Sequence, residues 1–432
     1  MYCVNKIAEF CKILTGIHRC YFSKLNESLM KKSIRILLAL LIVGFIITIP
    51  VLFAQNFQIE VNAGSVDRSN SVVSFYFPDA VDEGFYAIID EVGAERSLQV
   101  DSNNRGWFIL SELKAGDSKT FLFEGKESNS LNVNHQIDDD TILIRNEGRD
   151  VLNYFHGYNS PPAELDLRYK RGGYIHPVFT PSGVVLTNHL NVDLHPHHSG
   201  IWSAWTRTEF QGSTPDFWNI HNNTGRVDRA EGLEETWQGP VFAGFRAKHF
   251  FEDLSGDEPV TALNEEWKVR VFKSPEDFHM FDLVVTQTAN TSAPLILPEY
   301  RYGGVGFRGH ADWDDTENCT YLTSEGLGRD GHGTRVNWTH IGGHSDGELA
   351  GITIMSHPSN FRHPQTVRIH PDEPFFNFAP QQLGDMSIEP GSPYVVRYRY
   401  ITYDGEPNPE KLDALWIDFA YPPGVTVTQQ NF

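Results

Sequence analysis

The sequence predicts an all-β fold, with a small N-terminal β-sandwich followed by a larger, supersandwich-like β-sandwich with long loops. Short stretches rich in β-branched and aromatic residues recur along the chain, separated by Gly, Pro, Asn and Asp. Amphipathic helices are scarce, and 432 residues with 40% hydrophobic content can bury a large core. Many short strands without helical patterns between them are typical of a sandwich or barrel.

The clearest expected strands lie at residues 72–77, 85–89, 107–110, 120–123, 266–272, 281–288 and 394–403. One helix is expected from Pro409 to Phe419, because Asn408 can cap its first turn and Leu412 and Leu415 recur at helical spacing. By composition, the expected domains are a β-domain at 55–126, a main β-sandwich at 141–404 and a C-terminal tail with the short helix at 405–432.

The first 54 residues predict export. A basic head at residues 30–35 precedes the apolar run Ile36 to Phe53, and the small residue Ala54 follows, so residues 30–54 are expected to be a signal peptide cleaved near Gln55. Residues 1–29 would then be an upstream extension ahead of the true start. The alternative is a retained membrane anchor, since the apolar run is near the length of a span. The expected location is the periplasm or the medium, with membrane contact only if the segment is retained.

Charge and cysteine content indicate which partners and which covalent cross-links the protein can have. The chain has 56 acidic and 35 basic residues, a net charge of −21. Because phosphate binding needs a basic surface, nucleic acid is excluded as a partner. Of 4 cysteines only Cys319 follows the expected cleavage point, so the exported part cannot form an internal disulfide and depends on its core.

Histidines mark the expected site, above all the run His195-Pro196-His197-His198. On an extended segment His195 and His197 would face the same side, with His198 facing away. That geometry suits either two ligands of one divalent metal ion or two acid/base groups, and a purely structural role is the third alternative. The expected catalytic residues are His176, His195, His197, Glu299 and His332, with His195 and His197 as the alternative metal ligands.

Other residues are expected to contact a substrate. Flat aromatic rings pack on the C–H faces of a sugar, while arginine, histidine and amide groups bind its hydroxyls or a carboxylate. Core packing and solvated loop charges are the alternatives. The expected substrate contacts are Tyr174, Trp202, Trp218, Tyr302, Arg308, Arg335, His357, Asn360 and Arg362, with Glu299, Arg301 and Arg308 projecting into a cleft from one bent strand.

Five ordered motifs together resemble the bacterial DUF6807 family. They are Tyr174 to Pro177 with Thr180 to Gly183, His195 to Trp202, Asp216 to Asn219, Tyr302 to Gly304, and His357 to Asn360. The resemblance implies an exported protein, often from bacteria that degrade complex polysaccharides. The label methane oxygenase, often attached to this family, does not fit a β-rich chain without a set of membrane-spanning segments.

Three functions follow from these observations as expectations. The first is a lyase- or hydrolase-type enzyme acting on a sugar or glycoside in polysaccharide degradation, with a histidine and Glu299 as acid/base groups. The second is a metal-free enzyme resembling the aldose epimerases, and the third is a non-catalytic glycan-binding protein. All three take a sugar or oligosaccharide as ligand.

Overall fold

The computed structural model describes residues 56–430, so the expected upstream extension and signal segment lie outside the described residues. Within this part the chain is nearly all β, which confirms the fold-class prediction. The seven expected strands fall on β2, β3, β5, β6, β15, β16 and β26, whose bounds are given below. No helix between residues 56 and 430 is both long and apolar enough to cross a membrane.

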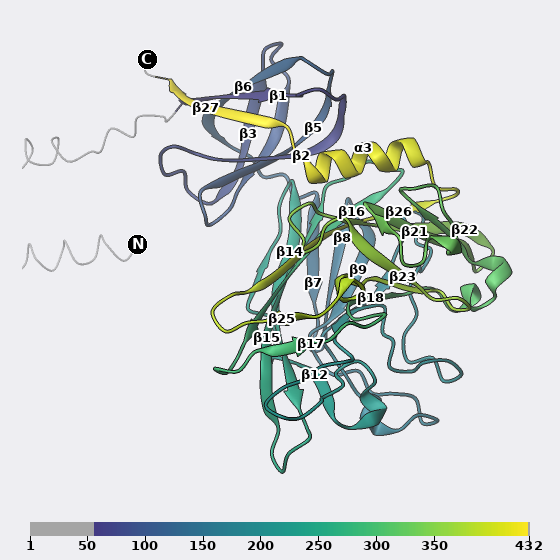
Figure 1. Cartoon of the computed structure of the whole chain (residues 1–432). Helices are drawn as coiled ribbons and strands as arrows, with labels where there is room; N and C mark the ends of the chain where they lie inside the picture. The colour runs from purple at the N-terminus through teal and green to yellow at the C-terminus, as the bar shows by residue number, and fades with distance from the viewer. Residues whose placement is uncertain (1–55, 431–432) are drawn as a thin grey trace, which may run out of the picture. The chain divides into compact units, whose positions relative to one another are not determined.

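The N-terminal sheet has seven antiparallel strands in the order β2-β5-β4-β3-β6-β1-β27. Alternate residues of β1, such as Phe57 and Ile59, point into a core enclosed by this one curled sheet. Its last strand comes from the expected C-terminal tail and runs along β1, with Ile59 opposite Val427 (Figure 1). The bounds are β1 Asn56–Asn62, β2 Arg68–Tyr76, β3 Gly84–Asp90, β4 Glu95–Val100, β5 Arg105–Leu113, β6 Ser118–Glu127 and β27 Gly424–Gln430.

The larger β-sandwich consists of two nine-stranded sheets. The first, called the β11 sheet, has the order β20-β23-β24-β18-β11-β10-β9-β8-β7. Its strands are β7 Val133–Ile137, β8 Thr141–Asn146, β9 Arg149–Phe155, β10 Tyr174–Val178, β11 Ile201–Ala204, β18 Gly304–Arg308, β20 Arg335–Val336, β23 Gln365–Ile369 and β24 Phe375–Phe378.

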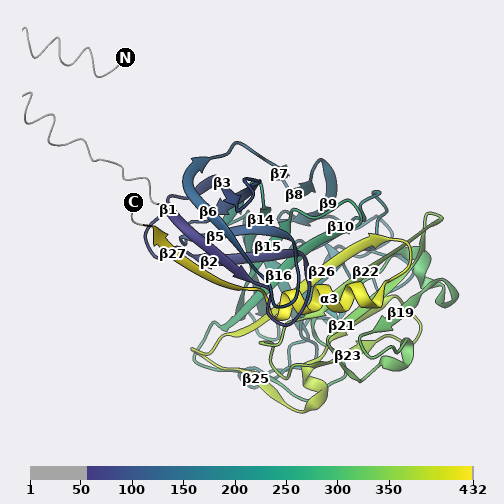
Figure 2. The same ribbon diagram turned by 90° about the horizontal axis from the view of Figure 1, so that it is seen from above.

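The second, called the β15 sheet, has the order β12-β14-β15-β16-β26-β22-β21-β19, with β13 beside β14. Figure 2 shows β14, β15, β16, β26 and β22 following one another in this order. Its strands are β12 Gly225–Arg229, β13 Glu235–Trp237, β14 Phe242–Asp253, β15 Val260–Phe272, β16 His279–Ala289, β19 Thr320–Thr323, β21 Trp338–Ser345, β22 Glu348–Ser356 and β26 Tyr394–Asp404.

The remaining elements are short. Strands β17 (Leu295–Leu297) and β25 (Met386–Ile388) form a separate pair, and the helix α3 (Pro409–Ala420) is capped by the Asn408 side chain as expected. The 3-10 helices are η1 Leu167–Tyr169, η2 Ile220–Asn222, η3 Ala311–Asp314, η4 Thr316–Asn318, η5 Arg329–Gly331 and η6 Pro380–Leu383.

Strand alternation divides the β11 sheet into two faces. Ile201, Phe307 and Phe376 belong to the core shared with the β15 sheet. Their neighbours Trp202 and Phe375 belong to a second aromatic cluster on the opposite face. The candidate site lies next to this second cluster, because the His198 ring stacks on Trp202.

Candidate functional site

The loop between β10 and β11 turns sharply at the histidine run. His195 has a left-handed backbone with φ of 49°, and His198 N–H donates to the His195 carbonyl at 2.9 Å, closing a turn. The two rings stack with centroids 4.9 Å apart and planes 9° from parallel. The expectation that His198 faces away from His195 is therefore wrong, because the segment is a turn and not an extended strand. A left-handed non-glycine residue costs about 1–3 kcal/mol and is found preferentially at functional sites.

Two further loops complete a group of five imidazoles, called the histidine cluster: His195, His197, His198, His221 and His370. The His197 ring lies 4.5 Å from His198 and 5.5 Å from His221, which is in η2. The His370 ring, just after β23, lies 6.2 Å from His195. The structure thus brings His195 and His197 together and adds His198, His221 and His370, which were not among the expected catalytic residues.

A buried ion network lies beneath the cluster. His195 Nδ1 is 2.8 Å from Glu373 Oε2, and Arg308 Nη1 donates to the same oxygen at 3.2 Å. Arg308 Nη2 donates to Asp314 Oδ1. Only 1% of the Arg308 side chain is exposed, so two carboxylates neutralise a buried cation. Arg308 is therefore unavailable as the substrate contact that the sequence predicted.

Burial sets the charge state of the cluster. Burial, followed by the nearby charges of His195 and His221, lowers the pKa of His197 to about 3. Burial also holds the pKa of His198 well below its ordinary value. Burial alone would raise the pKa of Glu373, but the close contact with His195 and the charge of that ring bring the pKa below its ordinary value. At neutral pH His197 and His198 are neutral and Glu373 is ionised.

Two tryptophans contact His198 of the histidine cluster. Trp202 stacks on the His198 ring at 4.9 Å, and Trp218 Nε1–H donates to His198 Nε2 at 3.3 Å. Both indoles are buried, with 0% and 2% exposed, so neither offers the open sugar platform that the sequence predicted. Gly306, opposite Trp202 on β18, leaves the space they occupy, since a Cβ there would lie 2.9 Å from Trp218. Tyr302 packs with its ring 5.2 Å from Trp218 and is half-buried.

A second polar stack lies on β10. The His176 ring stacks on His189 at 3.9 Å, and its Nδ1 is 2.9 Å from Thr187 Oγ1. The Tyr174 hydroxyl is 3.0 Å from His189 Nδ1, and the side chain is fully buried. Burial lowers the pKa of His176 well below its ordinary value and raises that of Tyr174 to about 12. Tyr174 is buried, whereas His176 and His189 are half-buried, and these contacts hold the three rings together. The predicted catalytic role of His176 stays a prediction.

Glu299 and His332 do not join the cluster. Glu299 is exposed, its backbone N–H donates to Asp385, and its carbonyl accepts from Arg207. His332 Nδ1 accepts from the backbone N–H of Ile369. The carboxylate that contacts His195 is that of Glu373, and the predicted acid/base role of Glu299 stays a prediction. No motif in the sequence analysis included Glu373, because an acidic residue in a loop gives no distinct pattern.

The third predicted motif group stabilises loops. Arg335 donates to the carbonyls of Arg362, His363 and Pro364, while Arg362 itself donates to those of Pro380, Gly384 and Asp385. The Asn360 amide donates to the Arg397 carbonyl, and His357 Nδ1 is 2.8 Å from Ser359 Oγ. Arg335, Asn360 and Arg362 thus stabilise the backbone of neighbouring loops, and the predicted substrate contacts of these residues and of His357 stay predictions.

One metal-ligand geometry can be tested on these contacts. Ligand atoms of His195, His198 and Glu373 lie within 4.8 Å of one another. An indole N–H can only donate, so His198 Nε2 accepts from Trp218 and Nδ1 carries the hydrogen. In this arrangement neither nitrogen of His198 has a lone pair for a metal ion. His197, the predicted partner of His195, is not in this donor set, so the residues do not fit a three-ligand metal site as they stand.

Comparisons with known proteins place these observations in context. The profile of DUF6807, described as a family of unknown function, matches residues 141–417. A comparison with curated proteins finds no match. Among solved structures, an α-mannosidase from Enterococcus faecalis V583 is similar at 10% identity and a TM-score of 0.38, covering 88% of this chain and 46% of that one. A protein in glycosyl hydrolase family 38 from Enterococcus faecalis is similar at 10% identity and a TM-score of 0.32, covering 88% and 48%. The chain spans about half the length of these two structures.

Proposed function

This chain belongs to the DUF6807 family, whose function is unknown, and we propose that it is an exported carbohydrate-active enzyme of lyase or hydrolase type with His195 as its acid/base group. The contact between His195 and Glu373 carries the proposal. A carboxylate 2.8 Å from Nδ1 favours the protonated ring by its charge and leaves Nε2 for proton transfer.

Exposure favours His195 over its neighbours. Its side chain is 39% exposed, whereas His197 and His198 are buried. A general base must be reachable by the group whose proton it takes. The buried His197 and His198 then pack around the reacting imidazole, and their neutral state adds no positive charge that would oppose its protonation.

One imidazole can both take and return the proton in such a site. His195 Nε2 takes a proton from a water molecule in hydrolysis, or from a sugar carbon in elimination. The resulting imidazolium is stabilised by ionised Glu373, which Arg308 holds in place. His195 returns the proton to the leaving oxygen, so the dyad ends in its starting state.

The same contact argues against the aldose-epimerase alternative. An epimerase of that kind needs a histidine and a carboxylate acting separately, on the ring oxygen and on the anomeric hydroxyl. Here His195 and Glu373 contact each other, and Arg308 also binds the carboxylate. They form one acid/base unit, which suits a single proton transfer at a time.

The carbohydrate part of the proposal rests on the aromatic and amide side chains beside the cluster. Tyr302 is half-buried beside the cluster, and Tyr300 packs 5.1 Å from it. The Asn219 amide donates to the Tyr302 hydroxyl at 3.3 Å. An aromatic face next to amide and imidazole groups suits a sugar, whose ring has apolar faces and polar edges.

Turnover of an oligosaccharide panel by wild type and His195→Ala tests the proposal. We expect His195→Ala to lower turnover by about 10²–10⁴-fold, the usual contribution of general acid–base catalysis. His344→Ala, on the exposed face of β21, is the matched control and should retain activity. New reducing ends indicate hydrolysis, and ultraviolet absorbance from a new conjugated double bond indicates elimination. Saturable binding without turnover by wild type, or full activity in His195→Ala, contradicts the proposal.

Export has a separate test. Cleavage near Gln55 predicts that protein recovered from the periplasm or medium lacks the apolar run at residues 36–53. Mass spectrometry of the native protein measures this directly. An intact run in the native protein would mean a retained anchor instead.

A further inference from the structure

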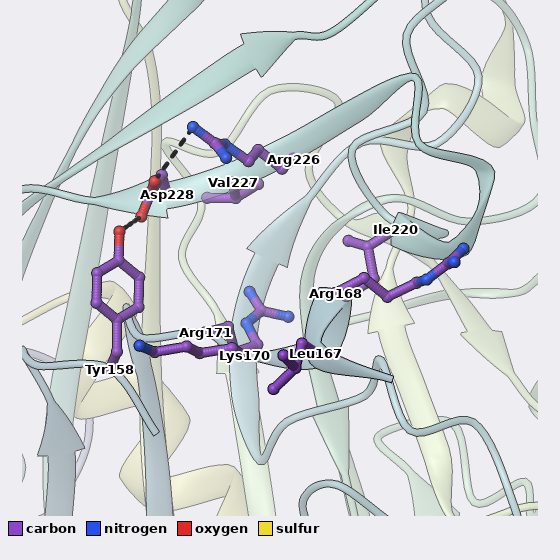
Figure 3. A pocket seen from close by; sticks show the side chains of 9 residues that line it. All are labelled: Tyr158, Leu167, Arg168, Lys170, Arg171, Ile220, Arg226, Val227 and Asp228. Atoms are coloured by element: carbon purple, nitrogen blue, oxygen red, sulfur yellow. Dashed lines mark hydrogen bonds and ion pairs between the residues drawn. The ribbon is translucent and has the colours of Figure 1, made fainter. Parts of the chain in front are cut away.

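A basic pocket lies against the histidine cluster. It has a volume of about 310 Å³, and its lining includes Arg168, Lys170, Arg171 and Arg226 but a single carboxylate, Asp228 (Figure 3). Ligand pockets usually start at roughly this size. In a chain with a net charge of −21, such a concentration of cations is unusual.

Two of the four cations already have carboxylate partners. Arg226 Nε is 2.6 Å from Glu252, and its Nη2 is 3.6 Å from Asp228. Arg168 is 3.2 Å from Asp166. Among the residues that the structure describes, no carboxylate oxygen lies within 4.0 Å of Lys170 or Arg171. The uncompensated charge of the pocket therefore comes from these two side chains.

Arg171 is the more informative of the two, because it is 92% buried, with 8% of its surface exposed. Its Nη1 donates to the His197 carbonyl at 3.3 Å, while its buried Nε has no acceptor within the described part of the chain. Burial lowers its pKa to about 10, so the guanidinium is still charged at neutral pH. A buried cation without a counter-ion is costly, and an anionic ligand would offset that cost.

The pocket is joined to the cluster through two backbone groups. Arg171 donates to the carbonyl of His197, and Arg168 Nη1 donates to that of His221 at 3.2 Å. Ile220, which precedes His221 in η2, also lines the pocket. A group bound in the pocket is thus held by the same residues that position two rings of the cluster.

We infer that this pocket binds the anionic group of an acidic sugar, a carboxylate or a sulfate ester, so that the substrate is an acidic glycan. The sugar part of this inference rests on the proposed function, whereas the anion part rests on the pocket alone. Arginine suits both groups, because its planar donors match two oxygens at once. Lys170 adds a second, exposed charge next to the Tyr158 ring.

Calorimetric titration of the purified protein with glucuronate, glucose 6-sulfate and glucose tests the inference. The titration uses the His195→Ala background, so that binding is measured without turnover. We expect at least one anionic sugar to bind at least tenfold more tightly than glucose, with an affinity that falls as salt rises. Binding of glucuronate alone identifies a uronic acid, binding of glucose 6-sulfate alone a sulfated sugar, and binding of both the shared anion chemistry.

Two variants localise the binding. Lys170→Gln changes an exposed side chain and should weaken anionic-sugar binding at least tenfold, while Lys126→Gln on β6 should leave it unchanged. Arg171→Gln should abolish binding, and circular dichroism checks that this variant folds. Equal affinity for glucose and the anionic sugars overturns the inference, as does unchanged binding in Lys170→Gln. If the protein shows no preference for anionic sugars but turns over a neutral glycan, only this inference fails. If it binds anionic sugars but turns over no glycan, only the proposed function fails.

Discussion

Replacing Glu373 by glutamine removes one negative charge from the network beneath the histidine cluster and keeps the size of the side chain. Glu373 Oε2 contacts both His195 Nδ1 and Arg308 Nη1. The change therefore has two expected effects. It weakens the electrostatic balance of a buried cation, and it removes the charge that favours the protonated acid/base imidazole.

The size of the first effect follows from burial. Removing one partner from a buried ion pair costs about 3–5 kcal/mol. Here Asp314 still neutralises Arg308, and the glutamine oxygen still accepts a hydrogen bond, so we expect a loss of about 1–3 kcal/mol in the free energy of unfolding. The folded-state pKa of Glu373 is lowered, so its contribution is present above its ordinary value of 4.5 and is lost as pH falls through the lower folded value.

Urea unfolding of wild type and Glu373→Gln at pH 7 and near pH 4 measures this loss. The difference in unfolding free energy between wild type and Glu373→Gln should have its whole value at pH 7 and be smaller near pH 4. Turnover should fall at least tenfold, because the imidazole loses the carboxylate that stabilises its protonated form. Glu348→Gln, an exposed change on β22, is the control. Equal unfolding free energies at pH 7 together with undiminished turnover would refute the role assigned to Glu373.

Two further predictions concern packing and pH. Gly306→Ala should lower the free energy of unfolding by about 1–3 kcal/mol, because its Cβ would lie 2.9 Å from Trp218, whereas Gly424→Ala, with its nearest contact at 4.0 Å, should have little effect. Chemical denaturation compares them, and equal stability would show that the indoles shift freely. The thermal midpoint should be steady above pH 7 and fall below about pH 6.5, since burial lowers the folded-state pKa of both His197 and His340 to about 3 and the unfolded chain then binds protons more readily. Calorimetry between pH 4 and 8 tests this, and a flat midpoint from pH 7 to 5 would contradict it.

The fold class was predictable because its signal is local. In β15 and β16 alternate residues face the core, and a single strand carries that pattern without reference to its partners. The helix α3 was equally predictable, from the capping residue Asn408 and the helical spacing of its leucines. Pairing between distant strands has no such signal, and the position of β27 beside β1 could not be inferred from either strand alone.

The site was only partly predictable, because it depends on contacts between segments that are distant in the sequence. The density of histidines indicated where chemistry lies, but their arrangement depends on a left-handed residue at His195 that a following proline does not suggest. Glu373 approaches His195 only because β24 and β11 flank the same strand, β18. Arg308 and Trp202 were singled out by residue type, yet residue type does not reveal that both are buried.

The pairing of β27 with β1 has a consequence for biogenesis. A chain emerges from the ribosome N-terminus first, so β1 is synthesised long before the strand that covers its edge. Until then Phe57, Ile59 and Val61 belong to a strand with an unpaired edge, which is a template for association with other chains. The first-made sheet is thus completed by one of the last-made segments. Proteolytic clipping after α3 should reopen that edge and give a protein that self-associates while its larger sandwich stays folded.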